Sequence, residues 1–139
     1  MLINETLFDE LTAKAKESPR LRMNFNLHDS LDAKAQRLFN ALEPGTVMPV
    51  HRHMASSETQ VLMRGSMKVM FYDDKGQITE EYMLDNSTGN YGVQIPAGVW
   101  HSLEVLQTGT IILEIKDGPY RPLQENDILM LNPHTDNGI

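Results

Sequence analysis

The chain contains no cysteine. A disulfide framework, a thiolate metal site and a cysteine nucleophile are therefore all excluded. Any bound metal ion must be held by nitrogen and oxygen donors, which means histidine and carboxylate side chains.

Positive charge and long apolar runs are also scarce. Twelve lysine and arginine residues face nineteen acidic ones, so the formal net charge is −7 at pH 7. No basic cluster offers the face that replaces counterions on a duplex, so we expect no nucleic-acid partner. No segment approaches the roughly 18 consecutive apolar residues of a membrane span. The first 14 residues carry acidic side chains where a secretory signal has a basic start, so we expect a cytoplasmic protein without membrane contact.

The first third of the chain has helical patterning. A helix capped by Asn4 is expected over residues 5–18, where a proline follows. A second helix is expected over residues 30–42, where apolar residues recur every three or four positions and "EPG" follows. These two helices would form an N-terminal extension, residues 1–44, packed on the rest of a single domain.

The pattern changes at residue 45. From there to residue 139, seven or eight short β-branched or apolar runs alternate with turn residues such as "DDKG" at 73–76. Short strands at this spacing are typical of a sandwich or small barrel. The sequence therefore predicts a mainly β protein, in which two short helices precede a β-barrel.

Two histidines lie in the segment "HRHMASSE". In a strand, His51 and His53 point to one face, while Arg52 points away. Their Cα atoms would lie about 6.6 Å apart, so both rings can reach one ion at roughly 2.0–2.1 Å. The turn at 54–57 can then place Glu58 on the neighbouring strand, across from the histidines. Taken alone, a His-x-His pair is more often incidental than a ligand pair.

A third histidine follows a turn containing Pro96 and Gly98. The strand after this turn puts His101, Leu103 and Val105 on one face. If that face is the interior, His101 completes a set of three imidazoles and one carboxylate. Such a set suits one divalent transition metal ion (Fe, Mn, Ni or Zn) and leaves one or two coordination positions open.

Two spaced motifs resemble the signatures of the cupin superfamily. They are Gly45-x5-His51-x-His53-x4-Glu58-x6-Gly65 and Pro96-x-Gly98-x2-His101. The second departs from the cupin pattern at its ends, where Asn90 and Val105 replace a glycine and an asparagine. These departures affect turn and packing positions and remove no ligand. The resemblance implies a double-stranded β-helix, or jelly-roll, barrel with a metal at the four ligands.

A closer resemblance, to the WbuC-type cupin-fold metalloproteins, covers roughly residues 7–120. It rests on "SPRLRMNFNLHDSLDAKAQRLFNALEPGT", "HRH", "SSE", "IPAGVWHSLE" and "LEIKDGPY". Members are often encoded near polysaccharide biosynthesis genes. The resemblance itself implies the fold and a metal ion more directly than it implies a substrate. Cupins often pair through an exposed sheet face or edge, so it also implies a homodimer.

Three polar residues are candidates for substrate binding. If Glu58 faces inward, strand alternation turns Gln60 inward too, either toward a substrate hydroxyl or into a hydrogen bond of the barrel wall. Residues 20–28 alternate strictly between polar and apolar side chains. On the polar face, Arg22 and Asn24 can grip a carboxylate, phosphate or sugar hydroxyl, or can belong to a solvated edge strand.

Two residues are candidates for proton transfer. Glu114 lies in the apolar run "TIILEIK", where a carboxylate is either outward and solvated or inward and paired. An inward Glu114 with a raised pKa can act as a general base. Tyr72 is a second candidate, although packing explains it equally well.

Two functions remain open from the sequence. The first is an enzyme in which the metal orients a small polar, sugar-like metabolite for isomerisation, epimerisation or oxygenation. The second is a non-catalytic small-molecule-binding module, in which the metal anchors a ligand or stabilises the barrel. The fold does not decide between them, because cupins host many reactions.

Overall fold

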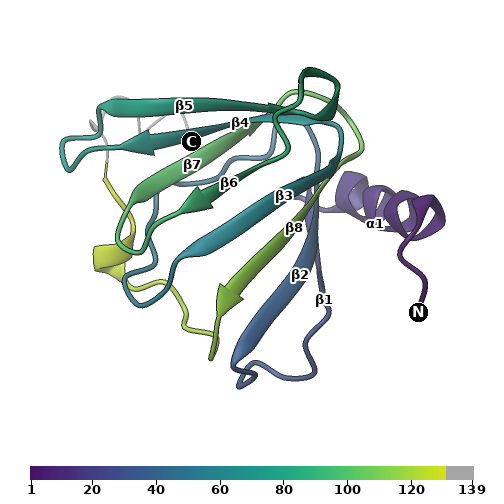
Figure 1. Cartoon of the computed structure of the whole chain (residues 1–139), viewed down its shortest axis with the longest axis horizontal. Coiled ribbons are helices and arrows are strands. Elements are labelled where there is room, and N and C mark those ends of the chain that lie inside the picture. The colour runs from purple at the N-terminus through teal and green to yellow at the C-terminus, as the bar shows by residue number, and fades with distance from the viewer. Residues whose placement is uncertain (131–139) are drawn as a thin grey trace.

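The computed structural model describes residues 1–130, which form two facing antiparallel sheets and one α-helix (Figure 1). The larger sheet has the order β1-β2-β8-β3-β6, and the smaller has the order β5-β4-β7. The elements are α1 (Glu5–Glu17), β1 (Arg22–Asn26), β2 (Ala35–Leu42), β3 (Glu58–Arg64), β4 (Ser66–Tyr72), β5 (Ile78–Asp85), η1 (Asn86–Thr88), β6 (Gly92–Ile95), β7 (Trp100–Val105), β8 (Thr110–Asp117) and η2 (Glu125–Asp127).

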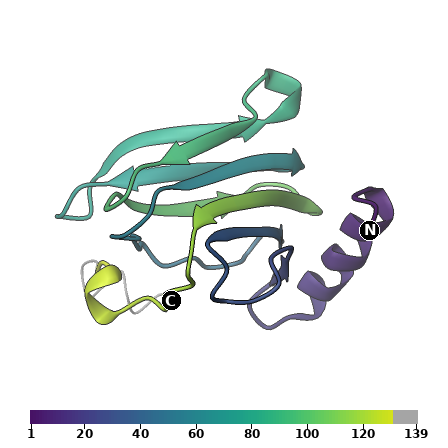
Figure 2. The same cartoon turned by 60° about the horizontal axis from the view of Figure 1, so that its bottom comes forward.

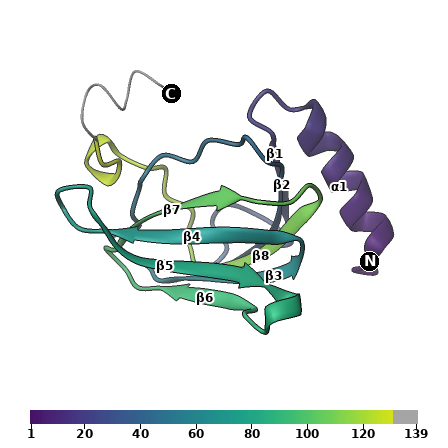
Figure 3. The same cartoon turned by 90° about the horizontal axis from the view of Figure 1, so that it is seen from above.

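The main core lies between the two sheets (Figure 3). Alternate residues of β4 turn inward, as strand periodicity requires, and belong to one core cluster with Leu62 of β3 and Ile112 of β8. The expected mainly β fold is therefore confirmed, but the expected closed barrel is wrong. Within residues 1–130, β5 and β6 are edge strands that pair on one side only, so the two sheets form an open sandwich. The core residues are Leu42, Leu62, Met67, Val69, Phe71, Leu84, Ile95, Leu103, Val105 and Ile112.

The first predicted helix is confirmed as α1. The side chain of Asn4 accepts a hydrogen bond from the Leu7 amide at 3.1 Å, which caps the helix. The apolar face of α1 covers the outer face of the larger sheet, where Phe8 meets Phe39 edge-on with ring centroids 5.4 Å apart. Figure 2 shows α1 at the opposite end of the molecule from η2, which is drawn in yellow. Within the described part of the chain, no helix has both the length and the hydrophobicity needed to cross a bilayer.

The second predicted helix is wrong, because residues 35–42 form strand β2. Leu38 and Leu42 face the space between the sheets, whereas Phe39 and Ala41 pack under α1. A strand covered on both faces has apolar residues at almost every position, so spacings of three and four arise without a helix. Pairing with β1 on one edge and β8 on the other then satisfies the backbone, and Leu31 is left 53% exposed. Strands β1 and β2 thus extend the larger sheet.

Gly65 forms the corner at which the chain leaves one sheet for the other. Its φ is +89°, a left-handed conformation that side chains other than glycine adopt at a cost. A Cβ at this position would lie 2.6 Å from the Cα of Thr110. Only glycine fits both constraints, which accounts for the closing glycine of the first motif.

Arg64 of β3 connects α1 to the larger sheet through hydrogen bonds. Its guanidinium donates to the backbone oxygen of Gly109 at 2.8 Å, to the Thr12 hydroxyl at 3.1 Å and to the Asp9 carboxylate at 2.9 Å. We expect Arg64→Met to lower the free energy of unfolding by about 1–2 kcal/mol, since it removes these bonds but keeps the apolar stem. Urea unfolding measures the change, and the exposed Lys16→Met serves as control. Unaltered amide hydrogen exchange in α1 would contradict the assignment.

Candidate metal centre

The segment that carries the first two histidines is extended and lies between two neighbours. On one side, His51 forms an antiparallel bridge with His101, through amide-to-carbonyl bonds of 3.0 and 2.9 Å. On the other side, residues 127–129 pair with it, since the Arg52 amide donates to the oxygen of Asp127 and the Leu129 amide donates to that of Val50. The two motifs are therefore joined directly by backbone pairing.

This pairing brings three imidazoles together. Ligand nitrogens of His51, His53 and His101 all lie within 4.8 Å of one another. The Nδ1 atoms of His51 and His101 lie 2.9 and 3.0 Å from the backbone oxygens of Pro49 and Val99. A carbonyl oxygen only accepts, so each Nδ1 carries its proton and donates. The Nε2 lone pairs of these two rings are thereby left available to a metal.

Glu58 approaches this cluster from the opposite sheet. The expectation that it lies on a strand next to the histidines is wrong, because β3 pairs with β6 and β8. Its side chain instead crosses the space between the sheets, and its Oε2 lies 3.4 Å from Nε2 of His101. Both atoms are buried and have no hydrogen-bond partner within the described chain. Buried polar atoms without partners are costly, so their convergence fits a cation held by the three histidines and Glu58.

The protonation states also suit a cation. Burial, and then the neighbouring His101, lowers the pKa of His51 to about 4. Burial likewise lowers the pKa of His53, although the negative charge of Glu58 acts to raise it. Burial of Glu58 acts to raise its pKa, but contact with His101 outweighs this and brings the pKa down to about 2. At neutral pH, His51 and His53 are therefore neutral and Glu58 is ionised, as metal ligation requires.

An inner cavity of about 190 Å³ lies beside the cluster. Of the predicted substrate and proton-transfer residues, Gln60, Asn24 and Glu114 line it. Gln60 is buried, and its Oε1 has no hydrogen-bond partner among residues 1–130. Gln60 and Glu114 lie directly opposite each other on β3 and β8, and both line the cavity that the three histidines also line.

Glu114 has an environment that favours its protonated form. Burial, and then the negative charge of Glu58, raises its pKa to about 8, although Lys116 and a hydrogen bond from Asn40 act in the other direction. The carboxyl group keeps some solvent contact because it lines the cavity. A group that titrates near neutral pH can both take up and release a proton there.

The structure places the other two predicted residues elsewhere. Arg22 donates to the backbone oxygen of Val47 at 2.8 Å and to the Thr46 hydroxyl at 3.4 Å, and it does not line the inner cavity. The hydroxyl of Tyr72 lies 2.7 Å from that of Ser102, and Tyr72 is not among the cavity residues either.

Among the residues of the site that were given no role from the sequence are Asn40, Lys116 and Arg121. Asn40 lines the inner cavity from β2, where a helix was expected. Lys116 shares the inward face of β8 with Glu114, so strand alternation was the signal available for it. Arg121 enters on the segment after β8, for which the sequence carried no signal.

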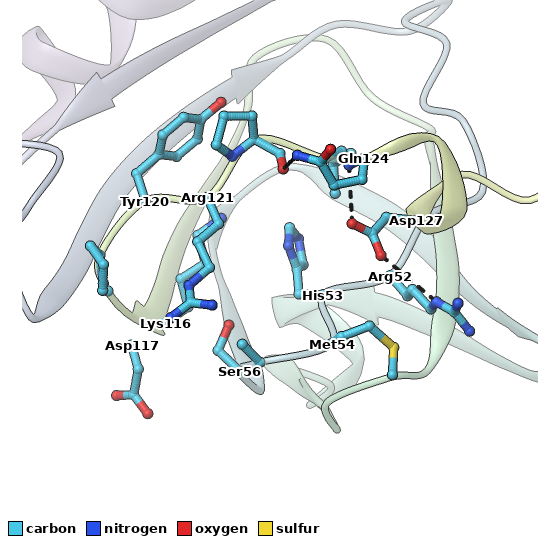
Figure 4. Close-up of a pocket in the computed structure, with 15 residues that line it drawn as sticks. Arg52, His53, Met54, Ser56, Lys116, Asp117, Tyr120, Arg121, Gln124 and Asp127 are labelled. Atoms are coloured by element: carbon cyan, nitrogen blue, oxygen red, sulfur yellow. Dashed lines mark hydrogen bonds and ion pairs between the residues drawn. The ribbon is translucent and has the colours of Figure 1, made fainter.

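Lys116 and Arg121 also line a second, outer pocket of about 470 Å³ (Figure 4). His53 lies at the boundary between the inner cavity and this pocket. The remaining walls come from Arg52, from the turn at 54–56, and from residues 117–124 and 127. The outer pocket therefore adjoins the metal cluster.

Residues 3–84 match a family described as a domain of unknown function, DUF6016, over more than half of the chain. The chain belongs to this family. The DUF6016 match includes His51, His53 and Glu58 and ends before His101. No curated protein matches the sequence.

Solved structures of cupin-fold proteins share the fold of this DUF6016 chain. KdgF from Halomonas sp. aligns with a TM-score of 0.58 and 14% identity, over 75% of this chain and 84% of that chain. The capsular polysaccharide assembling protein CapF from Staphylococcus aureus aligns with a TM-score of 0.64 and 19% identity, over 83% of this chain and 33% of that chain. Oxalate decarboxylase from Bacillus subtilis, which has Mn(II) centres, gives a TM-score of 0.56 and 21% identity, over 79% and 28%. The chain thus spans a third or less of the last two proteins, and the likeness at these identities is one of fold.

Proposed function

We propose that the chain is a mononuclear metal-binding cupin enzyme that acts on a small, hydroxylated, sugar-like metabolite. The ion would be one divalent transition metal (Fe, Mn, Ni or Zn), held by His51, His53, His101 and Glu58. The convergence of three imidazoles within 4.8 Å on a buried carboxylate whose Oε2 has no hydrogen-bond partner in the described chain carries this proposal.

When bound, the ion would supply Lewis acidity toward a substrate oxygen. The residues of the chain have separate tasks. Asn24, Asn40 and Gln60 line the inner cavity with amide groups that can bind and orient hydroxyl groups. Glu114 can hold a proton at its carboxyl group and exchange it with a bound molecule at neutral pH.

The class of reaction that best fits these residues is isomerisation or epimerisation, because Glu114 supplies a proton-transfer group beside the cluster. Oxygenation is the second reaction, and it would require iron. A role in polysaccharide biosynthesis is part of the proposal, and the fold shared with CapF supports it.

Membership of the WbuC-type cupin proteins, a homodimeric state and a cytoplasmic location complete the proposal. For the homodimer, the support is that β5 pairs only with β4 among the described strands and exposes Ile78, Tyr82 and Met83. An unpaired strand edge with apolar side chains is a surface that another chain can cover.

The test is proton exchange in heavy water. The metal-loaded protein is incubated with a panel of sugars and sugar acids, and proton NMR follows the loss of signal at carbon atoms next to carbonyl groups. We expect exchange with one class of compound, and a rate at least about 100-fold lower for Glu114→Gln, since general acid–base catalysis contributes about that much. Oxygen uptake is recorded in parallel for the iron-loaded protein. Binding without exchange, oxygen uptake or any other conversion would contradict the enzyme and favour a non-catalytic binding module.

A further inference from the structure

The residues that line both the inner cavity and the outer pocket carry positive charge. Five residues have this position: His53, Lys116, Tyr120, Arg121 and Leu123. Two of them are cations and none is a carboxylate. Within residues 1–130, neither Lys116 nor Arg121 forms an ion pair.

Lys116 is fixed beside the candidate metal ligands. It lies on β8 directly opposite Glu58 of β3 and is half-buried. Its charge acts on His53, Glu58 and Glu114, whose pKa values it lowers. The ammonium group therefore belongs to the electrostatic surroundings of the metal cluster.

The acidic residues of the outer pocket do not neutralise this pair of cations. The carboxylate of Asp127 lies 3.9 Å from the guanidinium of Arg52, so these two charges oppose each other. Figure 4 shows Lys116 and Arg121 reaching into the pocket from the wall that faces His53, while the Asp117 carboxylate points away from it. The Glu58 carboxylate lies opposite Lys116 and lines the inner cavity only, and a divalent ion at the histidines would offset its charge. A boundary that carries two cations then concentrates ligands of negative charge.

The inner cavity favours a different kind of ligand group from the boundary. Asn40 Oδ1 and Gln60 Oε1 are buried acceptors without a hydrogen-bond partner in the described chain. Acceptors without partners are satisfied by ligand groups that donate hydrogen bonds, such as hydroxyls. Hydroxyl donors are thus favoured next to the metal cluster, and a negative group is favoured one step outward.

We propose that the boundary between the two cavities is an anion-binding subsite, in which Lys116 and Arg121 hold the acidic group of a polyhydroxylated ligand whose hydroxyl groups reach Asn40 and Gln60. This inference rests on the proposed function and deepens it, because it gives the substrate class as a small hydroxylated acid. The acidic group is a carboxylate or a phosphate, since a lysine and an arginine recognise both.

The test uses three probes that share a hydroxylated six-carbon frame. They are D-gluconate (a carboxylate), D-glucose 6-phosphate (a phosphate) and D-glucitol (neutral). Isothermal titration calorimetry measures their binding to the metal-loaded protein and to its Lys116→Met and Arg121→Gln variants. Lys14→Met and Arg20→Gln remove the same charges from exposed positions that line neither cavity, so they are matched controls.

We expect at least one acidic probe to bind about 10-fold or more tightly than D-glucitol, and the tighter of the two identifies the acidic group. Lys116→Met and Arg121→Gln should each weaken that probe by roughly 10-fold, as expected for a hydrogen bond to a charged group. Both variants should bind D-glucitol with the affinity of the unmodified chain. The control variants should bind all three probes with that affinity too. Arg121 is exposed, so its variant keeps the test decisive even if Lys116→Met fails to fold.

The inference is overturned if D-glucitol binds as tightly as the acidic probes, if no probe binds, or if the two variants lose no more affinity than the controls. Elemental analysis of the same samples separates this failure from that of the proposed function. Failure of the acidic probes with about one metal ion per chain overturns the subsite alone. The absence of metal, with none taken up on reconstitution, overturns the proposed metal centre.

Discussion

The His101→Ala variant is expected to lose almost all of its bound metal, with an affinity at least about 100-fold below that of the unmodified chain. Replacing the outer partners of metal ligands already costs 10- to 100-fold in affinity, and His101 is a proposed ligand itself. Its removal also takes away the ring nitrogen that lies 3.4 Å from the buried Oε2 of Glu58. Elemental analysis after dialysis, and competition with a chelator of known affinity, measure the loss.

The matched control for this variant is His28→Asn. His28 is a buried histidine outside the cluster, and its Nδ1 lies 2.9 Å from the backbone oxygen of Arg37, to which it donates. An asparagine amide nitrogen can take over that bond, so the control should keep about one metal ion per chain. Equal metal content in His101→Ala and His28→Asn, with both folded by circular dichroism, would refute the assignment of His101 as a ligand.

The Glu114→Gln variant is expected to stabilise the metal-free protein at alkaline pH but not at acidic pH. The folded-state pKa of Glu114 is raised from 4.5 to about 8, so between these values the folded chain binds one proton more than the unfolded chain. The stabilisation from this group is fully present below pH 4.5 and is lost as pH rises through 8. Glutamine cannot ionise and does not suffer this loss.

The difference in unfolding free energy between Glu114→Gln and the unmodified chain should therefore be larger at pH 8.5 than at pH 5. We expect an increase of about 2 kcal/mol, because solvent in the cavity screens part of the effect. Urea unfolding of chelator-treated protein at the two pH values measures it. The exposed Glu10→Gln on α1 is the control, with the same difference at both values. A Glu114→Gln difference that does not change with pH would show that this carboxyl group is not held protonated.

Most of the candidate metal site was predictable from the sequence, because its residues lie at short, fixed spacings. His51 and His53 share a face in any extended segment, and Gln60 shares the inward face of its strand with Glu58. The sequence did not indicate how Glu58 reaches the cluster. It arrives from the other sheet, and which sheets face each other depends on pairing between distant strands.

The errors have a common physical origin in tertiary context. Apolar spacing in residues 35–42 fits a helix as well as a strand that is buried on both faces, and only the pairing of β2 with β1 and β8 decides between them. The same error concealed Asn40, which turns toward the cavity only in a strand. Arg22 has the expected strand position, but its guanidinium donates a hydrogen bond to the backbone oxygen of Val47. The alternation pattern does not predict this contact.

The pairing of residues 127–129 with the histidine segment has a consequence for how the site is made. These residues leave the ribosome well after His51 and His53, so the histidine segment lacks one of its two backbone neighbours until residue 129 has emerged. His101 and the strand that carries it also emerge after the first two histidines. The candidate metal centre is therefore completed only after residue 129 has been synthesised, and we expect the ion to be acquired from then on rather than by the nascent segment that carries His51 and His53 alone.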